Sequence, residues 1–371
     1  MCIMAIKRPT VKKAKTTMEG ATIYLRSQKK WGKTTLFRNL VLAKYGDAEK
    51  GFLIGLGAEE GYDFLDQINA TQIDKYEDLK DTVDWLISEK GKEHDIRMIG
   101  FDVVDELMPL MEAHTIKLSQ KETGKPCKTI NQAFDGHHNG QIRCALETKK
   151  LMQRLKKAGF TLIAISHTKN KTIKPQGCQS EDDGYMQLTS TLMATYEAVF
   201  ADIFDFVFTG VVEKEVKDGK LEEANRYLYF RSDGYVDAGG RLGGNAIKTK
   251  MLWEGKSDYE LAQEFIEVVE EAIRKSALNP LSKEEFKEEQ KKEEKIIQEK
   301  AKEFIQNEQV NSINVERNEE IKKIITSKWK ETSKEVKEEI KTLMADKGIS
   351  KIGDVENNPT SVMEEILKKL N

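Results

Sequence analysis

The chain has 371 residues, of which 39% are hydrophobic and 33% are charged, and its formal net charge is only -3. This length suffices for one large domain with an appendage, or for two or three domains. The balanced charge excludes a protein that is basic throughout, so any contact with nucleic acid must be local. No apolar run is long enough to cross a bilayer, so no membrane contact is expected.

Residues 1–20 are predicted to be a flexible, basic N-terminus. No apolar segment follows their basic side chains, which argues against a secretory signal. Four cysteines are scattered without the spacing of a metal site, a pattern typical of a reduced, cytoplasmic protein with free thiols. They are Cys2, Cys127, Cys144 and Cys178.

Residues 21–278 are the main predicted domain, in which short apolar strands alternate with amphipathic helices. Strands are expected at 21–26, 52–57, 96–102, 160–166, 205–215 and 225–232, and helices near 34–45, 77–90, 140–158 and 258–277. This alternation is typical of an α/β fold with a mainly parallel sheet between two layers of helices. The sequence Lys217-Asp218-Gly219-Lys220 separates the last two strands and is typical of a hairpin, so an antiparallel extension of the sheet is expected.

Two regions of different composition follow. Residues 279–316 are dense in lysine and glutamate and are expected to be a charged helical linker. A short coiled coil is the alternative, although the heptad is not sustained. Residues 317–371 contain short helical patterns and are predicted to be a small helical module that docks or binds a partner.

The most informative motif lies directly after the first predicted strand. Gly32-Lys33-Thr34-Thr35 follows an apolar strand and precedes a helical pattern, which is the context of a phosphate-binding loop. Lys33 is expected to reach the β- and γ-phosphates of a nucleotide, and Thr34 to hold Mg²⁺. A chance Gly-Lys-Thr-Thr on a loop is the alternative. Seven residues of this loop are assigned to nucleotide binding, namely Ser27, Lys30, Trp31, Gly32, Lys33, Thr34 and Thr35.

This loop departs from the usual motif in two places. Ser27 stands where the first glycine is usual, and the bulky Trp31 precedes Gly32. Slow turnover, or binding without much hydrolysis, is therefore one possible outcome. The extra positive charges of Lys29 and Lys30 beside the phosphates are expected to offset part of the effect of the missing glycine.

The ends of three further strands carry polar residues. Glu60 follows the second strand and is the expected water-activating carboxylate, with Glu59 as the alternative. Asp102 ends the third strand and is assigned to Mg²⁺, which prefers hard oxygen ligands. His167 ends the fourth strand, where it can contact the γ-phosphate and report its loss. For each of them, an ordinary structural role is the alternative.

In this order, the motifs resemble the RecA-type ATPase core over residues 20–275. The closest likeness is to phage-encoded RecA-like proteins, nucleotide-binding proteins of the AAA type that are linked to recombination and single-strand annealing. The resemblance implies a RecA-like P-loop core in which Lys33 and Thr34 bind phosphates and Asp102 supports Mg²⁺. It also implies that Glu60 activates water and that His167 occupies the sensor position.

In such cores, the loops after the third and fourth strands face a central axis and hold DNA. The matching segments here carry lysines that can neutralise backbone phosphates, although acidic residues at 181–183 weaken the second segment and ordinary solvated loops are the alternative. The lysines assigned to DNA are Lys121, Lys125, Lys128, Lys169, Lys171 and Lys174. Arg241 is the favoured basic residue for completing the site of a neighbouring subunit, with Lys248 next.

The expected function is therefore that of an ATP-binding, Mg²⁺-dependent ATPase stimulated by single-stranded DNA, in phage-type recombination, annealing or replication. It is expected in the cytoplasm, that of a bacterial host if it is phage-encoded, as a homo-oligomeric ring or filament. Residues 317–371 would contact a replication or recombination protein. The alternative is a nucleotide-gated, non-enzymatic scaffold or helicase-loader-like adaptor. A small-molecule kinase is disfavoured because no arginine-rich lid is apparent.

Overall fold

The computed structural model describes residues 14–57, 62–174, 184–218, 220–242, 245–311, 315–329, 332–355 and 358–370. The chain divides into two compact units, Met1–Gln298 and Glu299–Asn371. Within the described residues, no helix combines the length and apolar character that a membrane span requires.

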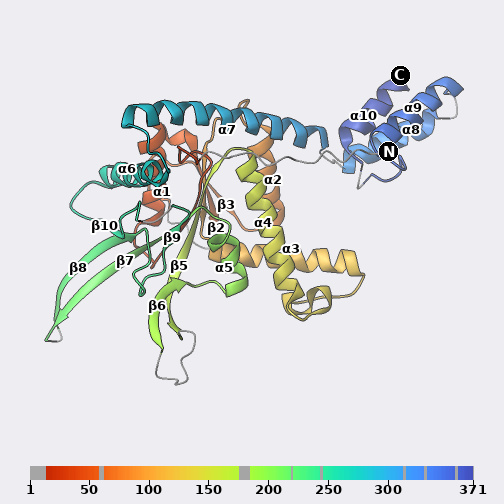
Figure 1. Ribbon diagram of the computed structural model, residues 1–371. Helices are drawn as coiled ribbons and strands as arrows, with labels where there is room; N and C mark the ends of the chain where they lie inside the picture. The colour runs from red at the N-terminus through yellow and green to blue at the C-terminus, as the bar shows by residue number, and fades with distance from the viewer. Residues whose placement is uncertain are drawn as a thin grey trace. The chain divides into compact units, whose positions relative to one another are not determined.

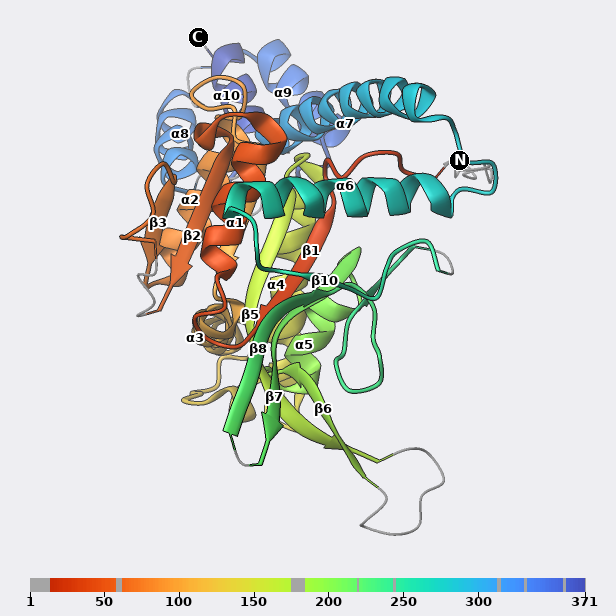
Figure 2. The same ribbon diagram turned by 90° about the vertical axis from the view of Figure 1, so that its left-hand side faces the viewer.

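The first unit is built on a twisted sheet whose described strands follow the order β10-β8-β7-β1-β5-β4-β2-β3 (Figures 1 and 2). Strands β3, β2, β4, β5, β1 and β7 are parallel, whereas β8 and β10 extend the sheet in antiparallel pairing. The strands of this order are β1 (Thr22–Ser27), β2 (Gly51–Leu56), β3 (Ala70–Ile73), β4 (Met98–Asp102), β5 (Thr161–Ile173), β7 (Phe206–Lys217), β8 (Lys220–Tyr229) and β10 (Lys250–Leu252).

This order confirms the predicted RecA-like P-loop core with a mainly parallel sheet and an antiparallel extension. Strand β1, which leads into the phosphate loop, lies between β5 and β7, and β5 separates it from β4. Every residue of β1 is buried, as expected for a parallel strand covered on both faces. Strands β3 and β10 at the ends of this path are not among the predicted strands. Two short strands off the path also escape prediction, β6 (Tyr185–Ser190), which pairs with β5, and β9 (Gly239–Gly240), which pairs with β7.

Helices cover both faces of the sheet. Helices α1 and α6 lie in front of the sheet in Figure 2, and α2 to α5 cover the other face (Figure 1). The helices of this unit are α1 (Lys33–Tyr45), α2 (Tyr76–Ser88), α3 (Val104–Thr123), α4 (Asn139–Lys157), α5 (Ala194–Ala201), α6 (Asp258–Ser276) and the first part of α7 (Lys283–Asn311), with 3₁₀ turns at Ala48–Lys50 and Ile130–Asp135. Of these, α3 and α5 are not apparent as separate helices in the sequence pattern.

Helix α6 shows why these residues form a covering helix. Ser257 accepts a hydrogen bond from the backbone of Glu260, whose side chain bonds back to the Ser257 backbone, so a capping box starts the helix. Leu261, Phe265 and Val269 then recur on one face and are fully buried against α1 and the sheet. Each such side chain contributes about 1.5–3 kcal/mol by leaving water.

The segment expected as a linker is the single long helix α7. Its first part packs on the first unit, because the buried Phe286 joins the main apolar core. Glu293 accepts a hydrogen bond from the Thr16 hydroxyl at 2.6 Å, and Glu294 lies 3.9 Å from the Lys44 ammonium. Glu293 and Glu294 of α7 therefore pair with other residues of the first unit and do not face water alone.

The second unit has its own small apolar core. It contains the end of α7 and the helices α8 (Val315–Lys328), α9 (Lys334–Asp346) and α10 (Thr360–Lys369). Ile321, Ile340 and Met363 are fully buried between these helices. The buried Asn318 donates to the carbonyls of Val355 and Asn358 at 3.0 and 2.8 Å and so ties α8 to the loop before α10.

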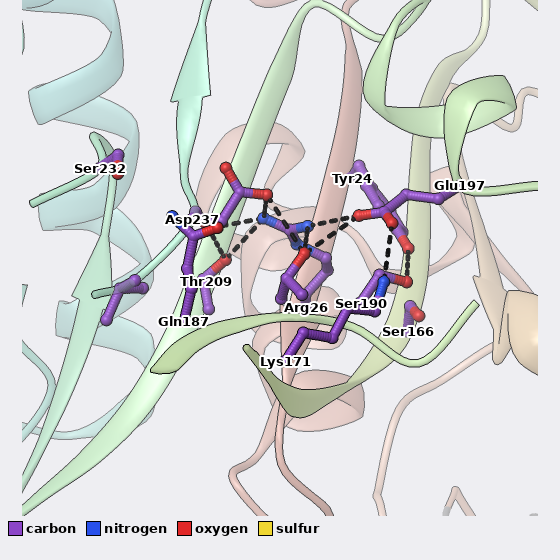
Figure 3. A network of polar contacts seen from close by, with 12 residues as sticks. Tyr24, Arg26, Ser166, Lys171, Gln187, Ser190, Glu197, Thr209, Ser232 and Asp237 are labelled. Carbon is purple, nitrogen blue, oxygen red and sulfur yellow. Dashed lines mark hydrogen bonds and ion pairs between the residues drawn. The ribbon is translucent and has the colours of Figure 1, made fainter. Parts of the chain in front are cut away.

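A buried guanidinium joins β1 to elements distant in sequence (Figure 3). The side chain of Arg26 is 0% exposed, and it lies 3.1 Å from Glu197 and 2.9 Å from Asp237. It also donates to the Thr209 hydroxyl at 3.3 Å, and Lys171 approaches the other Glu197 oxygen at 3.4 Å. Two carboxylates thus compensate the buried charge of Arg26, directly before the phosphate loop begins.

The neighbouring Tyr24 extends this polar layer on the same face of β1. Its hydroxyl lies 2.8 Å from the Ser190 hydroxyl, which joins β1 to the end of β6 (Figure 3). Burial raises the pKa of Tyr24 to about 12, so the phenol stays neutral at any ordinary working pH. The polar layer therefore carries charge only through Arg26 and its partners.

Replacing Arg26 by methionine is expected to lower the free energy of unfolding by about 3–5 kcal/mol, because it removes the buried cation that Glu197 and Asp237 share and leaves Glu197 with Lys171 alone. Urea unfolding followed by circular dichroism measures the loss. The matched control is Arg241→Met, at a side chain that is 61% exposed, with an expected change within about 0.5 kcal/mol. Equal losses in the two variants would show that the Arg26 network does not hold the fold together.

Candidate functional site

The phosphate loop turns sharply between β1 and α1. Lys30 and Gly32 both have a positive φ, of 60° and 107°. Gly32 caps α1, and its carbonyl accepts the first helical hydrogen bond, from Leu36, at 2.8 Å. This left-handed turn favours glycine at position 32. The first N–H groups of α1 have no partner within the helix and, together with the helix dipole, favour an anion at this point.

Lys33 folds back across this loop. Its ammonium lies 3.4 Å from the Ser27 carbonyl and 3.1 Å from the Gln28 carbonyl. The Nδ1 atom of His167 is also 3.4 Å away. The residue is only 6% exposed, so its charge is concentrated inside the loop. An anion held by the loop would therefore face this ammonium.

Thr34 and Asp102 supply neighbouring hard oxygen atoms. The Thr34 hydroxyl donates to Asp102 Oδ2 at 2.6 Å, and Asp102 is 5% exposed at the end of β4. A hydroxyl and a carboxylate fit Mg²⁺, which binds through one or two protein oxygens and completes its shell with water and substrate phosphates. Among the described residues no group of three or more acidic, histidine or cysteine side chains gathers around a point. The donors present thus suit a metal held jointly with phosphate.

His167 is held in place by its backbone. It ends the central part of β5, in register with Ser27, and its N–H donates to Asp105 at 3.1 Å. Thr191 donates both to the His167 carbonyl and to the second Asp105 oxygen. These contacts leave the ring beside Lys33, which is where a sensor of the terminal phosphate is expected.

A cavity of about 460 Å³ joins these groups. Its volume lies within the range of small-molecule sites. The residues that line it are Lys29, Lys30, Gly32, Lys33, Thr34, Thr35, Asp102 and His167. Seven of the residues predicted from the sequence therefore share one cavity.

Two predicted loop residues do not line this cavity. The Ser27 hydroxyl is buried and donates to the Gln28 carbonyl at 3.0 Å. Trp31 is 1% exposed, its ring centre lies 5.5 Å from that of Trp253, and its N–H donates to the Val211 carbonyl at 3.4 Å. The indole of Trp31 therefore anchors the loop in the apolar core and does not face the cavity, and a role of this residue in nucleotide binding stays a prediction.

The predicted catalytic carboxylates Glu59 and Glu60 lie outside the described residues. The neighbouring Gly57 closes β2, and a Cβ atom there would lie 2.7 Å from the Cγ of Glu106. Glu106 is exposed in the first turn of α3. A further carboxylate, not singled out from the sequence, thus lies at the end of β2.

Arg241 lies away from the cavity of its own chain. Its guanidinium donates to the carbonyls of Asp202 and Ile203 at 3.1 and 3.3 Å, near the start of β7, whereas the phosphate loop follows the carboxyl end of the adjacent parallel strand β1. Asp205 lies beside it. Burial would raise the pKa of Asp205, but the hydrogen bond and charge of Lys156 lower it below its ordinary value. Arg241 acting in a neighbouring subunit stays a prediction.

The lysines assigned to DNA fall in two places. Lys121, Lys125 and Lys128 are exposed at the end of α3 and just beyond it, and Lys125 pairs with Asp135 at 2.5 Å. Lys169, Lys171 and Lys174 lie on or next to the arm of β5 that continues past His167. Lys171 is half-buried against Glu197, so it belongs to the Arg26 network as well as to the hairpin.

The family is shown by comparison with known domains. The model of the AAA domain matches residues 19–242, which is more than half of the chain. The chain belongs to this AAA domain family. The matched segment starts just before β1, runs past β9, and contains every residue that lines the cavity. The family and the strand order together show a nucleotide-binding P-loop ATPase fold.

Solved structures and curated proteins add little detail. A KaiC-like protein from the hyperthermophilic archaeon Pyrococcus horikoshii is similar at 12% identity, with a TM-score of 0.31. The similarity covers 64% of this chain and 90% of that one. No curated protein shows a significant match.

The close contact between Trp31 and β7 is testable. A Cβ atom on Gly210 would lie 2.5 Å from the indole, so Gly210→Ala must displace the loop anchor and is expected to lower the free energy of unfolding by about 1–3 kcal/mol. Gly239→Ala is the control, because nothing lies within 4 Å of a Cβ there. Urea unfolding followed by tryptophan fluorescence compares the variants, and an unchanged Gly210→Ala midpoint would contradict the tight contact.

Proposed function

We propose that this AAA domain protein binds ATP with Mg²⁺ and hydrolyses it. The observation that carries the proposal is the convergence of Lys33, the Thr34–Asp102 pair and His167 on one cavity at the N-terminus of α1. Cation, hydroxyl, carboxylate and helix N-terminus are the groups that phosphoryl transfer requires. No arrangement among the described residues specifically favours a kinase or a protein that only carries phosphate.

Each group has a role in this proposal. Lys33 neutralises the β- and γ-phosphates, and Thr34 with Asp102 holds Mg²⁺. When bound, Mg²⁺ neutralises charge that develops on the phosphate oxygens. His167 contacts the terminal phosphate beside Lys33. Glu60 or Glu59, both of which follow β2 in the sequence, orients the attacking water.

Lys33→Ala is expected to weaken ATP binding about 10- to 150-fold, because it removes a charge-assisted contact to phosphate. Isothermal titration with ATP and Mg²⁺ measures the loss. The control is Lys92→Ala, at a lysine with a 56% exposed side chain that pairs with Glu89 on the surface. Unchanged ATP affinity in Lys33→Ala would contradict the assignment of this cavity as the nucleotide site.

We propose further that the protein acts on single-stranded DNA, in phage-type recombination, annealing or replication, as a cytoplasmic ring or filament. Support comes from the hairpin of β5 and β6, which projects beyond the sheet (Figure 1). Lys169 and Lys174 are exposed on it. Lysines attract the phosphate backbone, and aromatic rings stack on bases regardless of sequence.

An aromatic pair lies beside this hairpin. The rings of Tyr185 and Tyr235 are 6.2 Å apart, edge to face, and Tyr235 is 68% exposed. The backbone of Leu188 bonds to the Tyr235 carbonyl at 2.7 Å and to the Asp237 amide at 3.0 Å, so this segment is tied to β6. The lysines of the hairpin and the aromatic pair, with Tyr185 on β6 and Tyr235 on the segment bonded to it, thus lie next to each other.

Tyr235→Ala is expected to weaken binding of a labelled oligothymidylate about 5- to 150-fold, because one stacked base loses its platform. Fluorescence anisotropy with ATP present measures the affinity. Tyr259→Ala is the matched control, since that tyrosine is exposed on α6 away from the hairpin. If the intact chain binds no single-stranded DNA and added DNA does not change its ATPase rate, the DNA part of the proposal is wrong. The proposal of ATP binding is then unaffected.

A nucleotide-gated adaptor is the second candidate. The buried Ser27, where the motif usually has glycine, favours it because the loop is altered at its first position. The separate helical unit at Glu299–Asn371 would then recruit a replication or recombination protein. ATP binding without turnover, in the presence of DNA, distinguishes the adaptor from the ATPase.

A further inference from the structure

Arg226 lies next to the phosphate loop, although it is far from the loop in sequence. It stands on β8, in register with Val212 of β7. Because alternate residues of a strand share a face, Arg226 shares its face with Leu228, whose partner Gly210 lies under Trp31. This is the face covered by α1.

The guanidinium of Arg226 reaches the loop itself. Its Nη1 atom lies 4.0 Å from the position of a Cβ atom on Gly32, the residue directly before Lys33. The Arg226 side chain is 39% exposed, so the cation is open to an incoming ligand. The loop thus has a second positive group beside it, from a different strand.

Glu254 holds this guanidinium in the present structure. Its Oε1 atom lies 3.4 Å from Arg226 Nε and accepts the Arg226 backbone N–H at 3.0 Å. The Arg226 carbonyl accepts from Trp253 at 2.7 Å, which fixes Glu254 at the end of β10. Such a partly exposed ion pair contributes little, so exchange of the carboxylate for a phosphate costs little.

The sheet order decides which part of a nucleotide Arg226 faces. Asp102 and His167 lie on β4 and β5, on one side of β1, whereas Arg226 lies on β8, on the other side. Lys33 and Thr34 follow β1 between the two sides. A triphosphate with its γ end at His167 therefore has its α-phosphate end toward Arg226.

We propose that Arg226 binds the diphosphate part of the nucleotide within the same chain, and that Glu254 holds its guanidinium until the nucleotide arrives. A guanidinium suits this role because its planar donors match phosphate oxygens in pairs. The proposal rests on ATP binding by the loop. Since ADP retains this part of the ligand, Arg226 contributes equally to ADP and ATP affinity, whereas contacts on the γ side favour ATP.

Titration of ADP and ATP into purified Arg226→Ala tests the proposal. Both affinities are expected to fall about 10- to 100-fold by the same factor. Arg226→Lys restores part of the loss, because it keeps the charge without the paired donors. Glu254→Gln removes the competing charge but keeps an acceptor for the Arg226 backbone, and it is expected to bind both nucleotides about two- to fivefold more tightly.

Arg231→Ala is the matched control, because this arginine follows β8 and bonds instead to Asn245 and Thr249. Circular dichroism checks that each variant is folded. We expect unchanged spectra, because the partly exposed Arg226 side chain is not the sole support of the fold. A loss confined to ATP, or unchanged ADP affinity in Arg226→Ala, overturns the proposal while leaving ATP binding intact. If the wild type binds neither nucleotide, ATP binding and this inference both fail.

Discussion

The buried charge of Arg26 is the constraint on which the site depends. A guanidinium that is 0% exposed in a parallel sheet is stable only where carboxylates accompany it. Those carboxylates, Glu197 and Asp237, stand 171 and 211 positions further along the chain. The end of β1 therefore depends on α5 and on the segment beside β6, because these two elements supply the carboxylates. The phosphate loop begins at the next residue. The direction in which the chain enters this loop is therefore set by the ion pairs of Arg26 with Glu197 and Asp237, and not by the loop sequence alone.

The loop is anchored at its other end by apolar contact. Trp31 packs over Gly210 and against Trp253. Gly32 follows it as the cap of α1, and the helix starts at Lys33. Between a buried ion pair and a buried indole, the intervening residues have little freedom, and Lys33 bridges their carbonyls. Such preorganisation lowers the cost of ordering the loop around an anion. It also gives a physical reason why the loop keeps its turn with serine at position 27: the left-handed conformation is needed at Gly32 and Lys30, whereas Ser27 is ordinary strand.

Much of the architecture is readable from the sequence because its signals are local. Apolar runs that end in a polar residue locate β4 and β5, and they bring Asp102 and His167 to the same sheet edge as Lys33. The same logic fails where packing between distant segments decides the outcome. Trp31 belongs to the predicted phosphate loop, but its side chain is buried in the apolar core. Arg26 receives no role from the sequence, but its charge is buried in the sheet. Arg226 is one of several basic residues that follow the turn between β7 and β8, and only the folded structure places its guanidinium beside the phosphate loop. Arg241 is the more conspicuous candidate in the sequence, because glycines flank it. In the structure, however, it lies away from the phosphate loop of its own chain.

Strand β5 links the two halves of the proposed activity in one element. It runs without interruption from Thr161 to Ile173, so His167 beside Lys33 and Lys169 on the hairpin are two residues apart on the same strand. Under the proposed function, a shift of His167 on loss of the terminal phosphate would move the hairpin as well, because β6 is hydrogen-bonded to the same strand. Lys171 adds a second connection, since Glu197 binds both Lys171 and Arg26. If a DNA phosphate attracted Lys171, it would compete with Glu197, which also compensates the buried charge of Arg26. DNA binding and nucleotide binding would then be coupled through the Arg26–Glu197 ion pair.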